Sequence, residues 1–326
     1  MSFLAQLQSG RVLVLDGATG TELDRRGVDT SLPLWSARAL IVAPEVVRQI
    51  HRDYLEAGAD ILTTNAFRTH RRTLTRAGIG ERTRELTRLA VQLAREAIEQ
   101  SSRAAGIAGS MSPLEDCYSP SLVPPDDELR AEHLDIAQDL AGAGCDLLLV
   151  ETMNTIREAM FAVEAAQSTG LPVCVSFVVG PNGRPPDTCP ARYAAERCKG
   201  QIAAQVAAEP IRLLSGESIT AAVKALRELK PDAIMVNCVP LACIEPALEE
   251  LRAAWHGPIG LYANVGHADD ALGWTLTDDV QPEVYAQHAR RWIERGARIV
   301  GGCCGTSPAH IAAVRAQVDS FCPKAS

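Results

Sequence analysis

Short apolar runs alternate with longer amphipathic segments along almost the whole chain of 326 residues. The short runs have the length and β-branched content of buried strands, and the longer segments repeat their apolar residues with the period of a helix. The sequence predicts strands at residues 12–16, 61–64, 106–110, 146–152, 173–179, 233–238, 259–264 and 298–303. It predicts helices at residues 44–57, 81–100, 128–141, 155–168, 218–229, 244–255, 282–295 and 308–318. This succession of strand–helix units favours an α/β fold, the closed parallel (β/α)8 TIM barrel.

An open, doubly wound parallel sheet would also alternate strands and helices. That fold usually has a glycine-rich phosphate-binding turn after its first strand, whereas this chain has DGATGTEL at residues 16–23. Hydrophobic residues make up 47% of the chain, which is enough for one large core. We therefore predict a single barrel domain over residues 1–326. Three helix-to-strand joints, AGAD (57–60), AGAGCD (141–146) and RGAR (295–298), place a glycine where a helix ends in a left-handed residue.

The charge and the cysteine content of the chain restrict the class of partner. Lysine and arginine number 32 against 40 acidic residues, so the net charge of −8 gives no basic surface for nucleic acid or anionic lipid. We therefore expect small-molecule partners. The start of the chain lacks a secretory leader, and no run reaches the roughly 18 apolar residues of a membrane span, so we expect a cytoplasmic protein. In that reducing compartment, the 10 cysteines are not a disulfide framework.

Catalytic groups of a TIM barrel lie on the loops that follow the carboxyl ends of its strands. Those positions hold carboxylates, amides and thiols here, and a barrel would bring them to one rim. They are Asp16-Gly17, Thr63-Thr64-Asn65, Glu151-Thr152, Asn237-Cys238, Asn264 and Gly302-Cys303-Cys304. For Asp16, a turn or helix-cap role is an equal alternative. Glu151 follows a buried apolar run and must be paired there, which favours a ligand-binding role.

Cys238, Cys303 and Cys304 form the pattern of a catalytic zinc site, which uses three protein ligands and leaves one position open. Sulfur ligands select zinc over magnesium or calcium, and the neighbouring glycines let adjacent cysteines face one ion. From GGCC alone, two small buried residues that face opposite ways on a strand are an equal alternative. A vicinal disulfide is disfavoured, because it is strained and out of place in a reducing compartment. The third cysteine, at another strand end, favours the metal.

Five phrases of this chain resemble the homocysteine S-methyltransferase family. They are LDGATGTEL (15–23), ET (151–152), NC (237–238), YAN (262–264) and IVGGCCGTSPAHI (299–311). The family includes betaine–homocysteine methyltransferases and the homocysteine-binding module of cobalamin-dependent methionine synthase. The resemblance covers residues 10–318, and GGCCGT together with the upstream NC is its most specific part.

The resemblance implies a zinc-dependent methyltransferase of class EC 2.1.1, which acts in methionine biosynthesis. In such a protein Cys238, Cys303 and Cys304 hold Zn²⁺, which binds and ionises the thiol of L-homocysteine. The matching substrate residues are Asp16 and Glu151 for the ammonium, the amides around Gly17 and Ala18 for the carboxylate, and Asn237 for orienting the site. The ionised sulfur then takes a methyl group from an onium donor, which suits a thiolate-rich zinc centre better than hydrolysis does.

The methyl donor stays open between S-methylmethionine, S-adenosylmethionine and a betaine, and so do the oligomeric state and a preference for selenium analogues. Tyr262, Asn264, Trp274 and Phe67 are candidates for lining the donor site, with packing as the alternative. A zinc hydrolase is a weaker alternative, because it would use histidine and carboxylate ligands. A non-catalytic zinc barrel that binds thiols is the other alternative to a methyltransferase.

An atypical insertion at about residues 184–211 departs from the family pattern. It is a candidate lid or donor-binding loop, and a passive surface excursion or a non-native insertion in the gene model is at least an equal alternative. It carries Cys189 and Cys198, which we do not assign to the metal. The other cysteines outside the rim are expected to be packing or surface residues. They are Cys117, Cys145, Cys174, Cys243 and Cys322.

Overall fold

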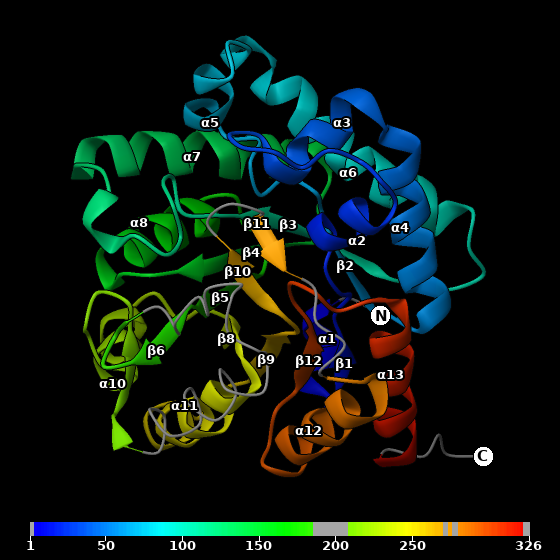
Figure 1. Ribbon diagram of the computed structural model, residues 1–326. Helices are drawn as coiled ribbons and strands as arrows, with labels where there is room; N and C mark the ends of the chain where they lie inside the picture. The colour runs from blue at the N-terminus through cyan, green and yellow to red at the C-terminus, as the bar shows by residue number, and fades with distance from the viewer. Residues whose placement is uncertain (1–2, 185–207, 270–272, 276–279, 322–326) are drawn as a thin grey trace.

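The computed structural model describes residues 3–184, 208–269, 273–275 and 280–321. Its main sheet has eight parallel strands in the order β1-β12-β9-β8-β5-β4-β3-β2, and a parallel bridge between Leu15 and Ile61 joins β1 to β2. The ring of strands therefore closes, and the predicted (β/α)8 barrel is confirmed (Figure 1). The strands are β1 (Leu13–Val14), β2 (Ile61–Thr63), β3 (Gly106–Met111), β4 (Leu147–Met153), β5 (Val173–Phe177), β8 (Ala233–Pro240), β9 (Ile259–Asn264) and β12 (Ile299–Gly302).

Helices surround the ring of strands on the outside (Figure 1). The long ones are α4 (Pro44–Ala57), α6 (Thr83–Glu99), α7 (Asp126–Ala143), α8 (Ile156–Gln167), α10 (Ile219–Leu226), α11 (Leu241–Ala254), α12 (Pro282–Glu294) and α13 (Pro308–Phe321). The short ones are α1 (Phe3–Gln8), α2 (Gly20–Arg25), α3 (Ala39–Val42), α5 (Arg71–Arg76) and the 3-10 turns η1 (Trp35–Arg38), η2 (Gly80–Arg82) and η3 (Pro120–Leu122). Within the described part of the chain, every helix is too short or too polar to cross a bilayer.

Each of the eight strands and eight long helices lies where the sequence predicts one, with differences at the ends. The predicted strand at residues 173–179 is interrupted after Phe177, because β6 (Val179–Pro181) leaves the barrel and pairs with β7 (Ile211–Leu213). This antiparallel pair joins the two ends of the predicted insertion, most of which lies outside the described residues. A second hairpin, β10 (His267–Asp269) with β11 (Gly273–Thr275), follows β9. Neither hairpin was predicted.

Three of the helix-to-strand joints contain a glycine with left-handed backbone, as predicted. The φ angles are 102° at Gly58, 96° at Gly144 and 99° at Gly296. Other residues adopt this conformation only at a cost in free energy, and glycine adopts it freely. The joints therefore end each helix at a defined residue and turn the chain into the next strand.

Aspartates just before three strands fix the register of the barrel at its amino end. In each case a carboxylate oxygen accepts a hydrogen bond from a backbone N–H at the start of a neighbouring strand. The pairs are Asp60 with Val14 (2.9 Å), Asp146 with Ile107 (2.8 Å) and Asp232 with Val173 (2.8 Å). Because these bonds fix the strands relative to one another, they also fix which residues face each other at the carboxyl ends.

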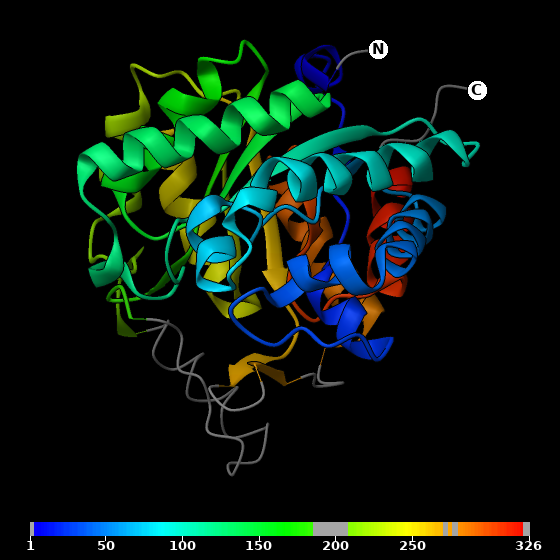
Figure 2. The same cartoon turned by 90° about the horizontal axis from the view of Figure 1, so that it is seen from above.

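The helix α1 covers the amino end of the barrel. Its Phe3 and Leu7 are buried in the apolar cluster that fills the barrel interior, which also contains Leu13, Leu147 and Ile299. Figure 2 shows α1, in dark blue, at the opposite end of the barrel from the β10–β11 hairpin. The helix α1 thus closes the amino end of the barrel interior, and the polar residues gather at the carboxyl end.

Replacing Phe3 by alanine is expected to lower the free energy of unfolding by about 3 kcal/mol, because the ring is lost from a packed interior. Phe3 is 7% exposed, whereas Phe321, near the other end of the chain, is 39% exposed. The matched variant Phe321→Ala should therefore have a much smaller effect. Denaturant unfolding of the two variants compares them directly, and equal losses would show that α1 does not close the barrel.

Candidate metal centre and substrate-binding residues

Three cysteine sulfurs meet at the carboxyl end of the barrel. Cys238 lies in β8, and Cys303 and Cys304 directly follow β12. Their Sγ atoms all lie within 4.8 Å of one another, and those of Cys238 and Cys304 are 3.9 Å apart. Sulfur ligands on a tetrahedral zinc, with bonds of about 2.3 Å, are about 3.8 Å apart. The three residues that the sequence predicts as ligands are therefore brought together at a spacing that fits zinc.

Two irregular strand ends shape this part of the site. Cys238 has a φ of 57° where the pairing of β8 with β9 shifts in register, between Asn237 and Pro240. Thr152 has a φ of 62° where the pairing of β4 with β5 shifts. Left-handed backbone is uncommon for a residue other than glycine, and for β-branched threonine it is strained. Such bulges are common next to active sites, where they re-aim side chains.

The side chain of Asn237 connects these two strand ends. Its Oδ1 accepts hydrogen bonds from the backbone N–H of Thr152 (3.1 Å) and the hydroxyl of Ser176 (2.7 Å). Its Nδ2 donates to Oγ1 of Thr152 (2.9 Å) and lies 4.0 Å from Sγ of Cys303. Asn237 is fully buried, and its contacts agree with the predicted role of orienting the site. A direct contact of Asn237 with substrate stays a prediction.

Polar groups also surround the sulfur of Cys238. The hydroxyl of Tyr118 lies 3.0 Å from this sulfur, and Nδ2 of Asn264 lies 3.8 Å from it. The pKa of Cys238 is well below its ordinary value, mainly because the thiols of Cys303 and Cys304 donate hydrogen bonds to it. The cluster therefore stabilises a thiolate, the form of cysteine that binds metals. Tyr118 comes from the loop between β3 and α7 and belongs to no recurring motif, so it was not predicted from the sequence.

The two predicted substrate carboxylates are buried beside this cluster without a cationic partner among the described residues. Asp16 accepts hydrogen bonds from the backbone N–H and the hydroxyl of Thr63, both at 2.8 Å, so it is neither a local turn nor a helix cap. Glu151 accepts hydrogen bonds from Ser110 (2.5 Å) and Tyr262 (3.3 Å). Burial of a charge costs free energy unless a partner compensates it, so an ammonium group would be bound strongly here.

The pKa values of both acids reflect this missing partner. Burial, with a smaller contribution from the negative charge of Glu151, raises the pKa of Asp16 to about 8. Burial likewise raises the pKa of Glu151 to about 7, with a smaller contribution from Cys238. Glu151 directly precedes Thr152, whose backbone N–H and hydroxyl bond to the side chain of Asn237, the residue before Cys238, so Glu151 lies beside the sulfur cluster.

The raised pKa of Asp16 predicts a pH dependence of stability. The folded protein holds this proton up to about pH 8, whereas the unfolded chain releases it near the ordinary pKa of 3.8, so the contribution of Asp16 to stability is lost as pH rises between these values. We expect the thermal midpoint of the metal-free protein to fall more steeply from pH 5 to pH 8 than that of Asp16→Asn. Parallel curves for the two proteins would contradict the raised pKa.

Gly17 and Ala18 lie between the first strand and the loop after β12. A side chain at Gly17 would place its Cβ 2.7 Å from the hydroxyl of Tyr54, so only glycine fits there. The N–H of Ala18 donates to Oγ1 of Thr306 (3.2 Å). The N–H of Gly17 makes no hydrogen bond within the described residues, which leaves it as the better candidate for a substrate carboxylate.

The remaining predicted site residues differ in where they lie. The hydroxyl of Tyr262 faces Glu151, and Asn264 faces Cys238, so both contribute to the site described above. Phe67 is half-buried and meets Trp35 edge to face. Three predicted cysteines lie outside the described residues, namely Cys189, Cys198 and Cys322, and so does the side chain of Trp274. The other four cysteines are buried free thiols, as expected of packing residues: Cys117, Cys145, Cys174 and Cys243.

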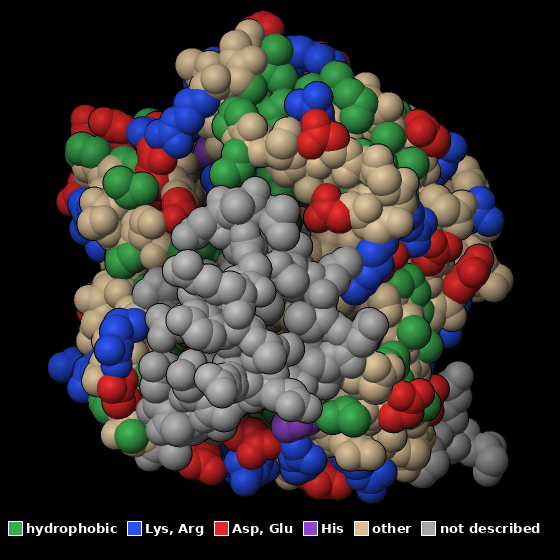
Figure 3. All heavy atoms as spheres, in the orientation of Figure 1, with side chains coloured by type: hydrophobic (Ala, Val, Ile, Leu, Met, Phe, Trp, Pro, Cys, Tyr) green, Lys and Arg blue, Asp and Glu red, His purple; other side chains and the backbone are tan. Residues whose placement is uncertain are grey.

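Acidic and basic side chains are interspersed around the face of the molecule seen in Figure 3. The described residues on this face form no extended patch of a single charge.

Comparisons with known proteins agree with the geometry. Residues 13–318 match the family model described as homocysteine S-methyltransferase. The chain is 30% identical over 327 residues to homocysteine S-methyltransferase YbgG of Bacillus subtilis, with 95% of each chain covered. It is 29% identical over 334 residues to the selenocysteine methyltransferase of Astragalus bisulcatus, covering 92% of this chain and 90% of that one. The metallated crystal structure of the homocysteine methyltransferase MmuM from Escherichia coli matches with a TM-score of 0.77 and 26% identity, over 96% of this chain and 98% of that one.

Proposed function

The chain belongs to the homocysteine S-methyltransferase family, and from this premise we propose that it transfers a methyl group from an onium compound to the sulfur of L-homocysteine, giving methionine. One observation carries the proposal. Three cysteine sulfurs within 4.8 Å of one another lie close to two buried carboxylates that have no cationic partner among the described residues. Cysteines that can hold a metal for a substrate thiol, next to carboxylates that can bind an ammonium group, suit an amino acid that carries a thiol. We assign the activity to one domain over residues 1–326.

Zinc is the metal that fits the cluster best. Its three donor atoms are all sulfur, and thiolates select zinc over magnesium or calcium. Cys238, Cys303 and Cys304 would hold the ion, and three protein ligands are the usual number in a catalytic zinc site. When bound, zinc supplies the acidity that ionises the substrate thiol at neutral pH, so that no general base is required. A hydrolase would instead use histidine or carboxylate ligands, and the cluster contains neither.

The residues of the chain position the substrate for this transfer. Asp16 and Glu151 would bind the ammonium group, and the N–H of Gly17 would bind the carboxylate. Fixing both charges of the amino acid restricts the sulfur to a small region beside the cysteine cluster. Holding reactants in the reactive geometry supplies a large part of the rate enhancement in bimolecular reactions.

The reaction itself balances without another reactant. The sulfur of homocysteine loses its proton and forms a bond to the methyl carbon, while the bond from that carbon to the onium sulfur or nitrogen breaks. The electron pair of the broken bond stays on the leaving group, whose onium atom becomes neutral, and the thiol proton is released to water. S-methylmethionine, S-adenosylmethionine and a betaine are the candidate donors. Phe67 is a candidate for contacting the donor, because its ring is half-buried at the carboxyl end of β2.

Metal analysis combined with an assay of methionine formation tests the proposal. The purified protein, incubated with L-homocysteine and each of the three onium compounds in turn, is expected to hold one zinc per chain and to form methionine with at least one donor. Homocysteine binding without methionine formation from any of the donors would indicate a thiol-binding protein instead. A protein that takes up no zinc would contradict the proposed function.

A further inference from the structure

The helix α2, with the sequence GTELDR, contacts the loop that carries two of the proposed metal ligands. None of its residues has a role in the proposed reaction. We propose that Arg25 of α2 is a positioning residue that holds the loop of Cys303 and Cys304 in its metal-binding conformation. This inference rests on the proposed zinc site. Arg25 would act through the backbone of the loop, without touching metal or substrate.

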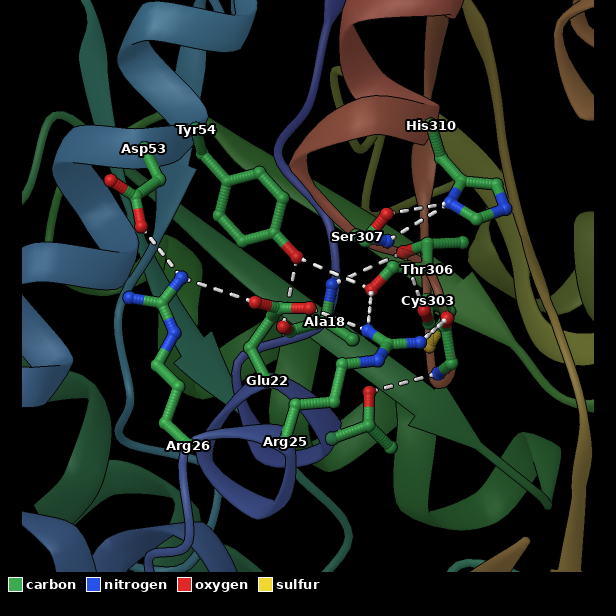
Figure 4. Close-up of polar contacts among 12 residues, drawn as sticks. Ala18, Glu22, Arg25, Arg26, Asp53, Tyr54, Cys303, Thr306, Ser307 and His310 are labelled. Carbon is green, nitrogen blue, oxygen red and sulfur yellow. Dashed lines mark hydrogen bonds and ion pairs between the residues drawn. The ribbon is translucent and has the colours of Figure 1, made fainter. Parts of the chain in front are cut away.

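Arg25 binds two successive backbone carbonyls just after the cysteine pair. Its Nη1 donates to the carbonyl oxygen of Thr306 (3.1 Å), and its Nη2 donates to that of Gly305. The hydroxyl oxygen of Thr21, also in α2, accepts a hydrogen bond from the N–H of Gly305 (3.0 Å). Figure 4 shows the guanidinium group of Arg25 directed at the backbone of this loop. The helix α2 therefore bonds to the N–H of Gly305 and to the carbonyl oxygens of Gly305 and Thr306.

The loop needs such contacts because it has left the regular strand. β12 ends at Gly302, and Gly305 has left-handed backbone with a φ of 80°. Inside the loop, the hydroxyl of Thr306 donates to the carbonyl of Cys303 (2.7 Å). The guanidinium group of arginine offers several donors in a fixed planar arrangement, so it can orient two carbonyls at once. Orienting the peptide of residues 305–306 fixes the direction from which the chain leaves Cys304.

A buried carboxylate holds Arg25 in place. Glu22 is 5% exposed and accepts from Nη1 of Arg25 and, at 3.1 Å, from Nη2 of Arg26. Arg26 also bonds to Asp53 of α4 at 2.6 Å (Figure 4). Both arginines therefore pair with the same acid and belong to the same short stretch. Of these two arginines, Arg25 bonds to the ligand loop and Arg26 bonds to Glu22 and Asp53, so Arg26 provides a matched control.

The variants Arg25→Met and Arg26→Met separate positioning from general stability. Each keeps an unbranched side chain and removes one ion pair with Glu22, so both should lower the thermal midpoint of the metal-free protein. Arg25→Met is expected to weaken zinc binding at least about tenfold, the usual effect of losing a group that supports a metal ligand. Arg26→Met should bind zinc as the unchanged protein does. Competition with a chromogenic zinc chelator measures both affinities.

Equal zinc affinities of the two variants would overturn the positioning role of Arg25, even if both are less stable. Should Arg25→Met fail to fold, Arg25→Lys decides the question. Lysine keeps the charge beside Glu22 but cannot donate to both carbonyls in the fixed geometry of a guanidinium. We expect Arg25→Lys to fold and to bind zinc more weakly, and an unchanged zinc affinity would overturn the inference. Absence of zinc from the unchanged protein would instead refute the proposed function.

Discussion

Replacing Cys303 by alanine is expected to remove both the bound zinc and the methyltransferase activity. The three cysteine sulfurs are the only group of metal-binding atoms found within the described residues. Removal of one leaves two sulfurs, fewer than the three protein ligands that catalytic zinc sites use. Without the metal, only a few per cent of a thiol with a pKa of about 8.5 is ionised at neutral pH. Elemental analysis of the purified variant and an assay of methionine formation measure the two losses.

The control for this experiment is a buried cysteine away from the cluster. Cys243 is fully buried in α11 and belongs to the outer apolar core. Cys243→Ala removes a thiol of the same size, so it should cost some stability while keeping both zinc and activity. Full zinc content in Cys303→Ala would exclude Cys303 from the ligands.

Replacing Glu151 by glutamine is expected to weaken the binding of homocysteine by about 100-fold and to leave the zinc content unchanged. Removing one partner of a buried charge pair costs about 2–5 kcal/mol, and each 1.4 kcal/mol is about tenfold in affinity. Glutamine has nearly the shape of glutamate and can still accept hydrogen bonds from Ser110 and Tyr262, so the loss would report the charge. Calorimetric titration of the zinc-loaded protein with L-homocysteine measures it.

Two further results make the test of Glu151 specific. Glu151→Asp keeps the charge in a shorter side chain and should lose less affinity than Glu151→Gln. The metal-free glutamine variant should also be at least as stable as the unchanged protein at pH 8, because it no longer buries an ionising acid with a pKa of about 7. An unaltered affinity for homocysteine in Glu151→Gln would exclude Glu151 from ammonium binding.

The barrel and the cysteine cluster could be predicted because both leave local signals. Hydrophobic periodicity marks the strands and helices, and a parallel barrel brings the ends of its strands to one rim. Cys238 and Cys303 therefore had to lie at the same rim, although 64 residues of chain separate them. The joints at Gly58 and Gly144 were predictable for a similar reason, because a helix that ends in a left-handed residue favours glycine.

Other parts of the site leave no local signal. The left-handed backbone at Thr152 and Cys238 could not be expected, because residues other than glycine rarely adopt it. Tyr118 reaches Cys238 from a loop 120 residues earlier in the chain, and Arg25 reaches Thr306 from 281 residues away. Contacts of this kind depend on how finished elements pack together. A single sequence contains no periodic pattern that reveals them.

The pairing of β1 with β12 also has a consequence for biosynthesis. Arg25 of the helix α2 is synthesised 281 residues before Thr306 of the ligand loop. The proposed set of three sulfur ligands therefore stays incomplete in a nascent chain until Cys303 and Cys304 have been synthesised. Uptake of zinc at the proposed site would therefore follow the synthesis and docking of this loop, so a chain that lacks residues 303 and 304 would lack two of the three proposed ligands.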